Sequence, residues 1–130
     1  MIVNVAVIGS RGITDKEWVF SKLDEYLNRF KTPSIKLQFA NNYPRIITGG
    51  AKGVDSLAEE YAKLNGLSLR VIKPINPSDK FSYLLRNVEI ITLADVILAF
   101  WDGESSGTGF VIGYAEKRNK DITVIRSDKR

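Results

Sequence analysis

Most of the groups able to bind or transform a ligand lie in three glycine-rich segments of this 130-residue sequence. The segments are residues 9–15, 48–55 and 101–109. Each follows a short apolar run and precedes a stretch with helical spacing, so each is expected where a strand passes into a helix. Glycines let such a loop turn tightly and expose its amides, and the start of the following helix attracts anions. The pattern predicts a phosphate site.

The first segment begins with Gly9, Ser10 and Arg11. Ser10 offers a hydroxyl, and the planar guanidinium of Arg11 suits a phosphate or a carboxylate. Thr14 or Asp15 is expected to cap the helix that follows.

The second segment is the most specific of the three, because three glycines in five positions open directly into a helix and form a nest of amides. Its residues expected to contact a ligand are Gly49, Gly50, Ala51, Lys52, Gly53 and Asp55. It is not a Walker loop of the form G-x-x-x-x-G-K-S/T, because Lys52 precedes the last glycine. A G-x-G-x-x-G motif is missing after the first strand, and the second strand ends without the expected acid, which disfavours ordinary NAD binding. A tight turn that serves no ligand is the alternative interpretation.

The third segment supplies hydroxyls and a second helix start. Asp102, Ser105, Gly107 and Thr108 are expected at the site. Asp102 is interpreted as a hydrogen-bond acceptor for a ribose or for its own loop, with capping of the helix by a neighbouring hydroxyl as the alternative. Trp101 either stacks on a base or packs in the core.

Arg86 and Asn87 are expected to reach the same site from a helix between the second and third segments. The long guanidinium of Arg86 suits a phosphate. A surface salt bridge from Arg86 to Glu89 or Asp79 is the alternative interpretation.

Composition removes several kinds of chemistry. The sequence has no cysteine and no histidine, which excludes thiol nucleophiles, disulfides, histidine-dependent triads and zinc sites built on either residue. We therefore expect no metal site and no cofactor, and the catalytic residues of any enzyme here stay unknown. The net charge of +4 permits an anionic partner without requiring one. No apolar run approaches the roughly 18 residues of a membrane span, and the N-terminus lacks signal-peptide features, so a cytoplasmic location without a membrane partner is expected.

Apolar runs and helical patterns alternate along residues 1–130, which predicts one α/β domain. Strands are expected over 3–8, 45–48, 67–73, 95–101 and 122–125, and helices over about 19–30, 54–62, 78–91 and 108–117. Strands that are apolar on both faces and joined by helices form a parallel sheet covered on both sides. The prediction is a three-layer, Rossmann-like, doubly wound fold with the usual strand order 3-2-1-4-5. Its ligand site is expected beyond the C-terminal ends of the first and fourth strands.

Two local predictions accompany this fold. The helix over 78–91 is expected to start at a Ser78 cap, with an inner face formed by Phe81, Leu84, Leu85, Val88 and Ile91. Residues 32–44 are long for a connection, and their alternating apolar pattern predicts an extra edge strand at 34–40, with a locally packed loop as the alternative. An edge strand would favour self-association, so assembly into a homo-oligomer is kept as an alternative to a monomer.

These motifs resemble the SLOG superfamily of Rossmann-like domains, and most closely its small YspA-like group. The residues that carry the resemblance are 5–11, 47–58, 86–87 and 95–108. The resemblance implies binding or sensing of a nucleotide or nucleotide-derived ligand. It implies that the phosphate lies on the loop of residues 49–53 and on Gly107 and Thr108.

Two other branches of the superfamily supply alternatives. LOG-type phosphoribohydrolases carry P-G-G-x-G-T-x-x-E, whose Gly-Thr is kept here, while Val111 stands where the catalytic glutamate is expected. Loss of that acid disfavours cleavage of an N-glycosidic bond. The acids left for such an enzyme are Asp102, Glu104 and Glu116. The second alternative is single-stranded nucleic-acid binding, as the resemblance to DNA-processing protein A implies. It ranks below the others because the aromatic residues are expected in the core rather than along a basic groove.

Overall fold

The computed structural model of the protein describes residues 2–30 and 43–130, so the predicted edge strand at 34–40 lies outside the described residues. The strands are β1 (Ile2–Gly9), β2 (Tyr43–Thr48), β3 (Ser68–Val71), β4 (Val96–Trp101) and β5 (Asp121–Arg126). The helices are α1 (Lys16–Leu27), α3 (Val54–Leu64), α4 (Lys80–Leu93) and α5 (Ser106–Lys117), with short 3₁₀ turns η1 (Asn28–Phe30) and η2 (Ser127–Lys129).

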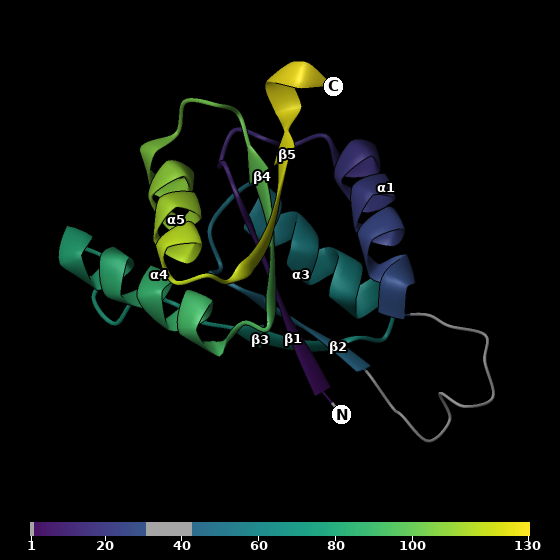
Figure 1. The fold of residues 1–130 in the computed structure, drawn as a ribbon, viewed down its shortest axis with the longest axis horizontal. Coiled ribbons are helices and arrows are strands. Elements are labelled where there is room, and N and C mark those ends of the chain that lie inside the picture. The colour runs from purple at the N-terminus through teal and green to yellow at the C-terminus, as the bar shows by residue number, and fades with distance from the viewer. Residues whose placement is uncertain (1, 31–42) are drawn as a thin grey trace.

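The five strands form one parallel sheet in the order β3-β2-β1-β4-β5, which confirms the predicted topology. Helices α1 and α3 lie on one side of the sheet, and α4 and α5 lie on the other (Figure 1). The domain is therefore the Rossmann-like, three-layer α/β fold expected from the alternating pattern.

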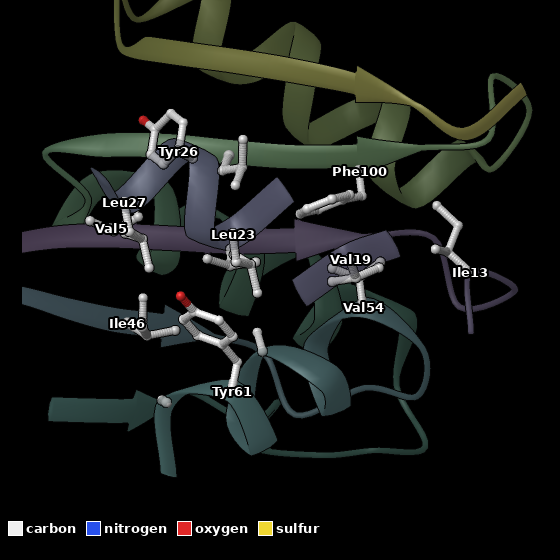
Figure 2. Packing of buried hydrophobic residues seen from close by; sticks show 14 residues of the cluster. Val5, Ile13, Val19, Leu23, Tyr26, Leu27, Ile46, Val54, Tyr61 and Phe100 are labelled. Atoms are coloured by element: carbon white, nitrogen blue, oxygen red, sulfur yellow. The ribbon is translucent and has the colours of Figure 1, made fainter. Parts of the chain in front are cut away.

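Strand β1 contributes side chains to both cores of the domain, because its side chains alternate between the two faces of the sheet. Val5 and Val7 point into the core beneath α1 and α3, where Leu23, Tyr61 and Phe100 pack (Figure 2). Ala6 and Ile8 belong to the second core, on the side of α4 and α5. Each fully buried Val or Ile side chain contributes about 1.5–3 kcal/mol, so β1 helps to fix both helical layers to the sheet.

Helix α4 differs from its prediction in its cap and in its buried face. Asp79, not Ser78, caps the helix, and its carboxylate accepts the amide of Phe81 at 3.0 Å. The buried residues of the helix are Ser82, Arg86, Ile90 and Ile91. Phe81 and Leu85, predicted to face inward, are 60% and 51% exposed. Ile91 is buried as predicted, whereas the prediction was wrong for Phe81 and Leu85, because Arg86 is turned toward the sheet, where its guanidinium binds the β2–α3 loop.

Adjacent strands β1 and β4 continue into helices on opposite faces, since β1 leads to α1 and β4 leads to α5 (Figure 1). This divergence opens a crevice beyond the C-terminal ends of the two strands. The same end of the sheet carries the β2–α3 loop. No helix in residues 2–30 and 43–130 is long and apolar enough to cross a membrane.

Candidate functional site

A cavity of about 840 Å³ lies at this crevice, walled by the β1–α1 loop, the start of α3, helix α4 and the β4–α5 loop. The predicted site residues that line it are Gly9, Ser10, Arg11, Ala51, Asp55, Arg86, Asn87, Asp102, Ser105, Gly107 and Thr108. The predicted residues that stand outside its lining are Gly49, Gly50, Lys52 and Gly53. Loops far apart in the sequence therefore meet at one cavity.

Ser10 ties the loop after β1 to the loop after β4. It is 1% exposed, and its amide donates to the carbonyl of Phe100 at 3.0 Å. Its hydroxyl lies 2.7 Å from the Ser105 hydroxyl and accepts the amide of Asp102 at 3.2 Å. Ser10 thus fixes the distance between the two loops across the switch point.

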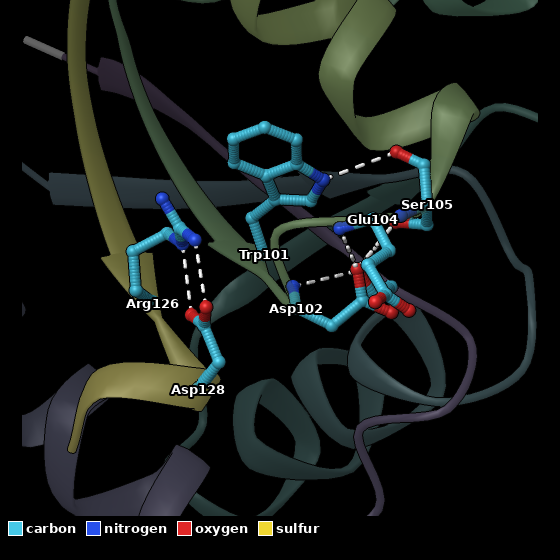
Figure 3. Close-up of polar contacts among 7 residues, drawn as sticks. Trp101, Asp102, Glu104, Ser105, Arg126 and Asp128 are labelled. Atoms are coloured by element: carbon cyan, nitrogen blue, oxygen red, sulfur yellow. Dashed lines mark hydrogen bonds and ion pairs between the residues drawn. The ribbon is translucent and has the colours of Figure 1, made fainter.

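Asp102 shapes the loop that leads into α5. Its Oδ1 accepts the amides of Glu104 and Ser105, both at 2.8 Å (Figure 3). These amides hold the pKa of the Asp102 carboxyl below its usual value, so the group stays ionised. Of the predicted interpretations, the geometry matches an acceptor for its own loop.

Trp101 is engaged in the same loop and does not line the cavity. Its Nε1 donates to the carbonyl of Ser105 at 3.0 Å, and the Arg126 guanidinium lies 5.0 Å from the ring centroid (Figure 3). Arg126 is itself held by two hydrogen bonds to Asp128. The ring packs against the core on the α4 and α5 side, so the core interpretation of Trp101 is correct.

The β2–α3 loop uses two of its own amides internally. The Asp55 carboxylate, 5% exposed in the first turn of α3, accepts the amides of Gly49 and Ala51 at 3.2 Å each. Burial raises the pKa of Asp55, against the effect of these amides and of the nearby Arg86 charge. Asp55 therefore holds the glycine-rich loop in shape.

Gly53 lets the β2–α3 loop lie directly against the β1–α1 loop. Its φ is +76°, and a Cβ there would stand 2.5 Å from the carbonyl oxygen of Arg11 and 2.7 Å from that of Ser10. Backbone atoms cannot give way as a flexible side chain does, so this approach requires glycine. Lys52, one residue earlier, is exposed and does not line the cavity.

Arg86 joins α4 to the β2–α3 loop. It is 8% exposed, and its Nη1 donates to the carbonyl of Gly49 at 2.5 Å, while its Nε donates to the Asn87 side chain at 2.8 Å. Burial lowers the pKa of Arg86, and the opposite charge of Asp55 counteracts this effect. Within the described residues it makes no ion pair with Glu89 or Asp79, so that alternative was wrong.

Several residues that line the cavity were missed in the sequence. Those with aromatic side chains are Tyr83 and Phe110. The ring centroid of Tyr83 lies 5.8 Å from the Arg11 guanidinium carbon and 5.3 Å from that of Arg86. The spacing of Tyr83 three residues before Arg86 places both on one side of a helix, which was the available signal.

The first turn of α5 faces the cavity with Ser106, Gly107 and Thr108. Its N-cap residue is Ser105, whose side chain makes no capping hydrogen bond. The first amides of a helix have no partner inside the helix and carry its positive dipole end. This wall of the cavity can therefore bind an anion, as the third segment predicts.

One known protein family matches the sequence of this chain. Residues 3–75, more than half of the chain, match the family described as YspA, cpYpsA-related SLOG. The chain belongs to this SLOG family. The matched span runs from β1 to just beyond β3 and includes the first two glycine-rich segments. No curated protein matches the chain at a significant level.

Solved structures similar to this SLOG protein share its fold. DNA processing protein A from Helicobacter pylori, described with a single-stranded DNA binding mode, is 24% identical, with a TM-score of 0.71 over 98% of this chain and 67% of that one. DNA processing protein A from Streptococcus pneumoniae is 19% identical, with a TM-score of 0.76 over 98% of this chain. A structural-genomics target, TM1055, is 21% identical, with a TM-score of 0.61 over 92% of this chain and 72% of that one. The SLOG protein spans about half the length, 52%, of the S. pneumoniae protein.

Proposed function

We propose that this SLOG protein binds single-stranded nucleic acid by taking one nucleotide unit into the cavity at the β1–β4 switch point. The observation that carries the proposal is the combination of a helix N-terminus, exposed cations and aromatic side chains around one cavity of about 840 Å³. A backbone phosphate needs the first two groups, and an unpaired base needs the third.

The phosphate is assigned to the first turn of α5. Ser106, Gly107 and Thr108 line the cavity there, and the amides of such a turn bind phosphate oxygens with the help of the helix dipole. Ser105, whose hydroxyl lies 2.7 Å from that of the buried Ser10, adds a hydroxyl at the same wall. The loop of residues 49–53 is also predicted to contact phosphate. It has fewer amides left for that role, because Asp55 accepts two of them.

Two exposed cations are placed to attract a polyanion. Arg11 and Lys80 line the cavity from the β1–α1 loop and from the start of α4. The chain as a whole carries a net charge of +4. Neutralising backbone phosphates with such cations releases counterions from the strand, which makes binding depend steeply on salt.

The fold neighbours favour a strand over a free nucleotide. Two of them are DNA processing protein A, and the H. pylori protein is described as binding single-stranded DNA. The partly exposed Tyr83 and the 39% exposed Phe110 are aromatic surfaces of the kind on which unpaired bases stack.

A free nucleotide or nucleotide-derived molecule is the second candidate. The cavity volume favours it, because about 840 Å³ falls within the range of roughly 300–1,000 Å³ typical of small-molecule sites. Both candidates share one chemistry, a nucleoside phosphate, and differ in whether neighbouring nucleotides add to the affinity.

A nucleotide hydrolase receives less support from the geometry. The two carboxylates that line the cavity, Asp55 and Asp102, each already accept two backbone amides. Val111, at the position matching the catalytic glutamate of LOG-type enzymes, lines the cavity and is 4% exposed. A general acid must be free to reach the leaving group, so we favour binding over cleavage.

Fluorescence anisotropy with a labelled oligothymidylate of about 15 nucleotides tests the proposal. We expect binding that weakens steeply with salt and that free nucleoside monophosphates or ADP-ribose compete away poorly. Arg11→Ser should weaken binding about tenfold, the loss of one charge-assisted phosphate contact. Arg118→Ser is the matched control, because Arg118 is an exposed arginine at the other end of α5. Tight mononucleotide binding with no gain from longer strands supports the second candidate, and binding of neither ligand overturns both.

A further inference from the structure

The cavity carries two chemically different sets of lining residues. The loops and the first turn of α5 provide hydroxyls and amides, at Ser10, Ser105, Ser106 and Thr108. The facing sides of α4 and α5 provide an apolar and aromatic wall, which includes Tyr83, Leu84, Phe110 and Val111. A nucleoside phosphate has the same division, with a charged end and a flat, weakly polar end.

Within the apolar wall, Tyr83 has the most constrained surroundings. Arg86 lies 5.3 Å from the Tyr83 ring centroid and is itself fixed by its bonds to Gly49 and Asn87. The exposed Arg11 guanidinium lies 5.8 Å from the same centroid. The ring is thus held beside a fixed cation, while its other close cation belongs to an exposed side chain.

We propose that Tyr83 is the platform on which the base of the bound nucleotide stacks, and that it makes the site recognise a nucleotide rather than a bare sugar phosphate. The inference rests on the proposed function, because it assigns the base end of that same cavity. A ring already held in place loses little conformational freedom when a base stacks on it. The exposed Arg11 guanidinium, which lies over the same ring, moves aside for the base and serves the phosphate.

Other aromatic residues near the site are less suited to this role. Trp101 is outside the cavity lining, and its indole is engaged by Ser105 and Arg126. Phe110 lines the cavity, but its ring contacts Tyr114 at a centroid distance of 5.9 Å. Phe110 is therefore the competing platform that an experiment must separate from Tyr83.

The experiment compares two strands of equal length, an oligothymidylate and an abasic deoxyribose phosphate oligomer. The wild-type protein should prefer the strand with bases by about tenfold, the effect of stacking one base. Tyr83→Leu should lose this preference while keeping its affinity for the abasic strand. Tyr83→Phe should retain the preference, because the ring remains.

Tyr114→Leu is the matched control. Tyr114 is also a tyrosine with a guanidinium beside its ring, since Arg118 lies 4.7 Å from its centroid, but it does not line the cavity. This variant should keep the wild-type preference for bases. If the free nucleotide proves to be the ligand, thymidine monophosphate and deoxyribose 5-phosphate replace the two strands.

The failures of the two proposals are distinguishable. If the wild type binds neither strand nor the free nucleotide, the proposed function itself fails. If the abasic strand binds as well as oligothymidylate, or Phe110→Leu removes the preference and Tyr83→Leu does not, only the assignment of Tyr83 is overturned. A photochemical crosslink from 5-iodouracil in a bound strand tests the wild type without any variant: attachment to Tyr83 supports the assignment, and attachment elsewhere overturns it.

Discussion

Arg86 and Asp55 meet at a single residue, Gly49. Arg86 Nη1 donates to the Gly49 carbonyl at 2.5 Å, and Asp55 Oδ2 accepts the Gly49 amide at 3.2 Å. A Cβ on Gly49 would stand 2.7 Å from Arg86 Nη1 and 2.9 Å from Asp55 Oδ2. Two buried, oppositely charged side chains therefore hold the end of β2 between α3 and α4, so they act first on the shape of the site.

This relationship predicts coupled losses of stability. Arg86→Met leaves the buried Gly49 carbonyl without its charged donor, and Asp55→Ala leaves the amides of Gly49 and Ala51 without their acceptor, each costing about 2 kcal/mol. The double variant should lose about 1 kcal/mol less than the sum, because the two side chains bind the same residue, Gly49. Urea unfolding measures the cycle, with Arg118→Met as an exposed control expected within about 0.5 kcal/mol of the wild type. Strictly additive losses would show that the two residues act independently.

Asp55 also predicts a pH dependence. Burial raises its pKa in the folded protein, so folding favours the protonated carboxyl. The stability from this group is fully present below the unfolded pKa of about 3.9 and declines as pH rises through the folded pKa. Asp55→Asn removes this contribution and leaves the other titrating groups in place. The free energy of unfolding of the variant minus that of the wild type should therefore rise between about pH 4 and pH 7. A difference that stays constant or falls contradicts the assignment.

Two glycines of the site should respond oppositely to alanine. Gly53→Ala places a Cβ against the backbone of Arg11 at a positive φ, so we expect a loss of about 3 kcal/mol. Gly107→Ala meets no atom within 4 Å, and alanine favours the helix, so we expect no loss or a gain of about 0.5 kcal/mol. Thermal unfolding of the two variants gives the comparison. Equal tolerance of both substitutions would contradict the close approach of the two loops.

The fold was predictable because its determinants are local. Apolar runs such as residues 3–8 are too short for a helix, helical patterns separate them, and right-handed crossovers leave few ways to order five parallel strands. The helix face of α4 was not predictable from hydrophobicity, which placed Phe81 and Leu85 inside. The actual face contains Arg86, whose burial depends on a carbonyl far away in the sequence.

The site was predictable at the level of loops and less so at the level of atoms. The glycine-rich segments were expected at one edge of the sheet, and most of their polar residues line one cavity there. Asp55 accepts the amides of Gly49 and Ala51 because of where its side chain lies in the first turn of α3. The spacing of residues in the sequence does not reveal that position. Tyr83 was missed because an aromatic residue in an amphipathic helix has the same sequence signature in a cavity wall as in a core.

Two lysines, Lys80 and Lys52, can distinguish a binding site confined to the cavity from one that extends beyond it. Lys80 lines the cavity at the start of α4, whereas Lys52 is exposed on the β2–α3 loop outside the lining. If the strand is held in the cavity, Lys80→Ser should weaken oligothymidylate binding and reduce the slope of log affinity against log salt by about 0.7, the contribution of one phosphate contact on a single strand. Lys52→Ser should then leave both quantities near the wild type, and Lys117→Ser, at the far end of α5, is the control for charge removal alone.

A loss of affinity in Lys52→Ser equal to that in Lys80→Ser would instead extend the phosphate path along the β2–α3 loop, as the glycine-rich motif predicts. Anisotropy titrations at several salt concentrations decide between these outcomes, because a local contact changes the slope while a general loss of charge weakens attraction at every salt concentration.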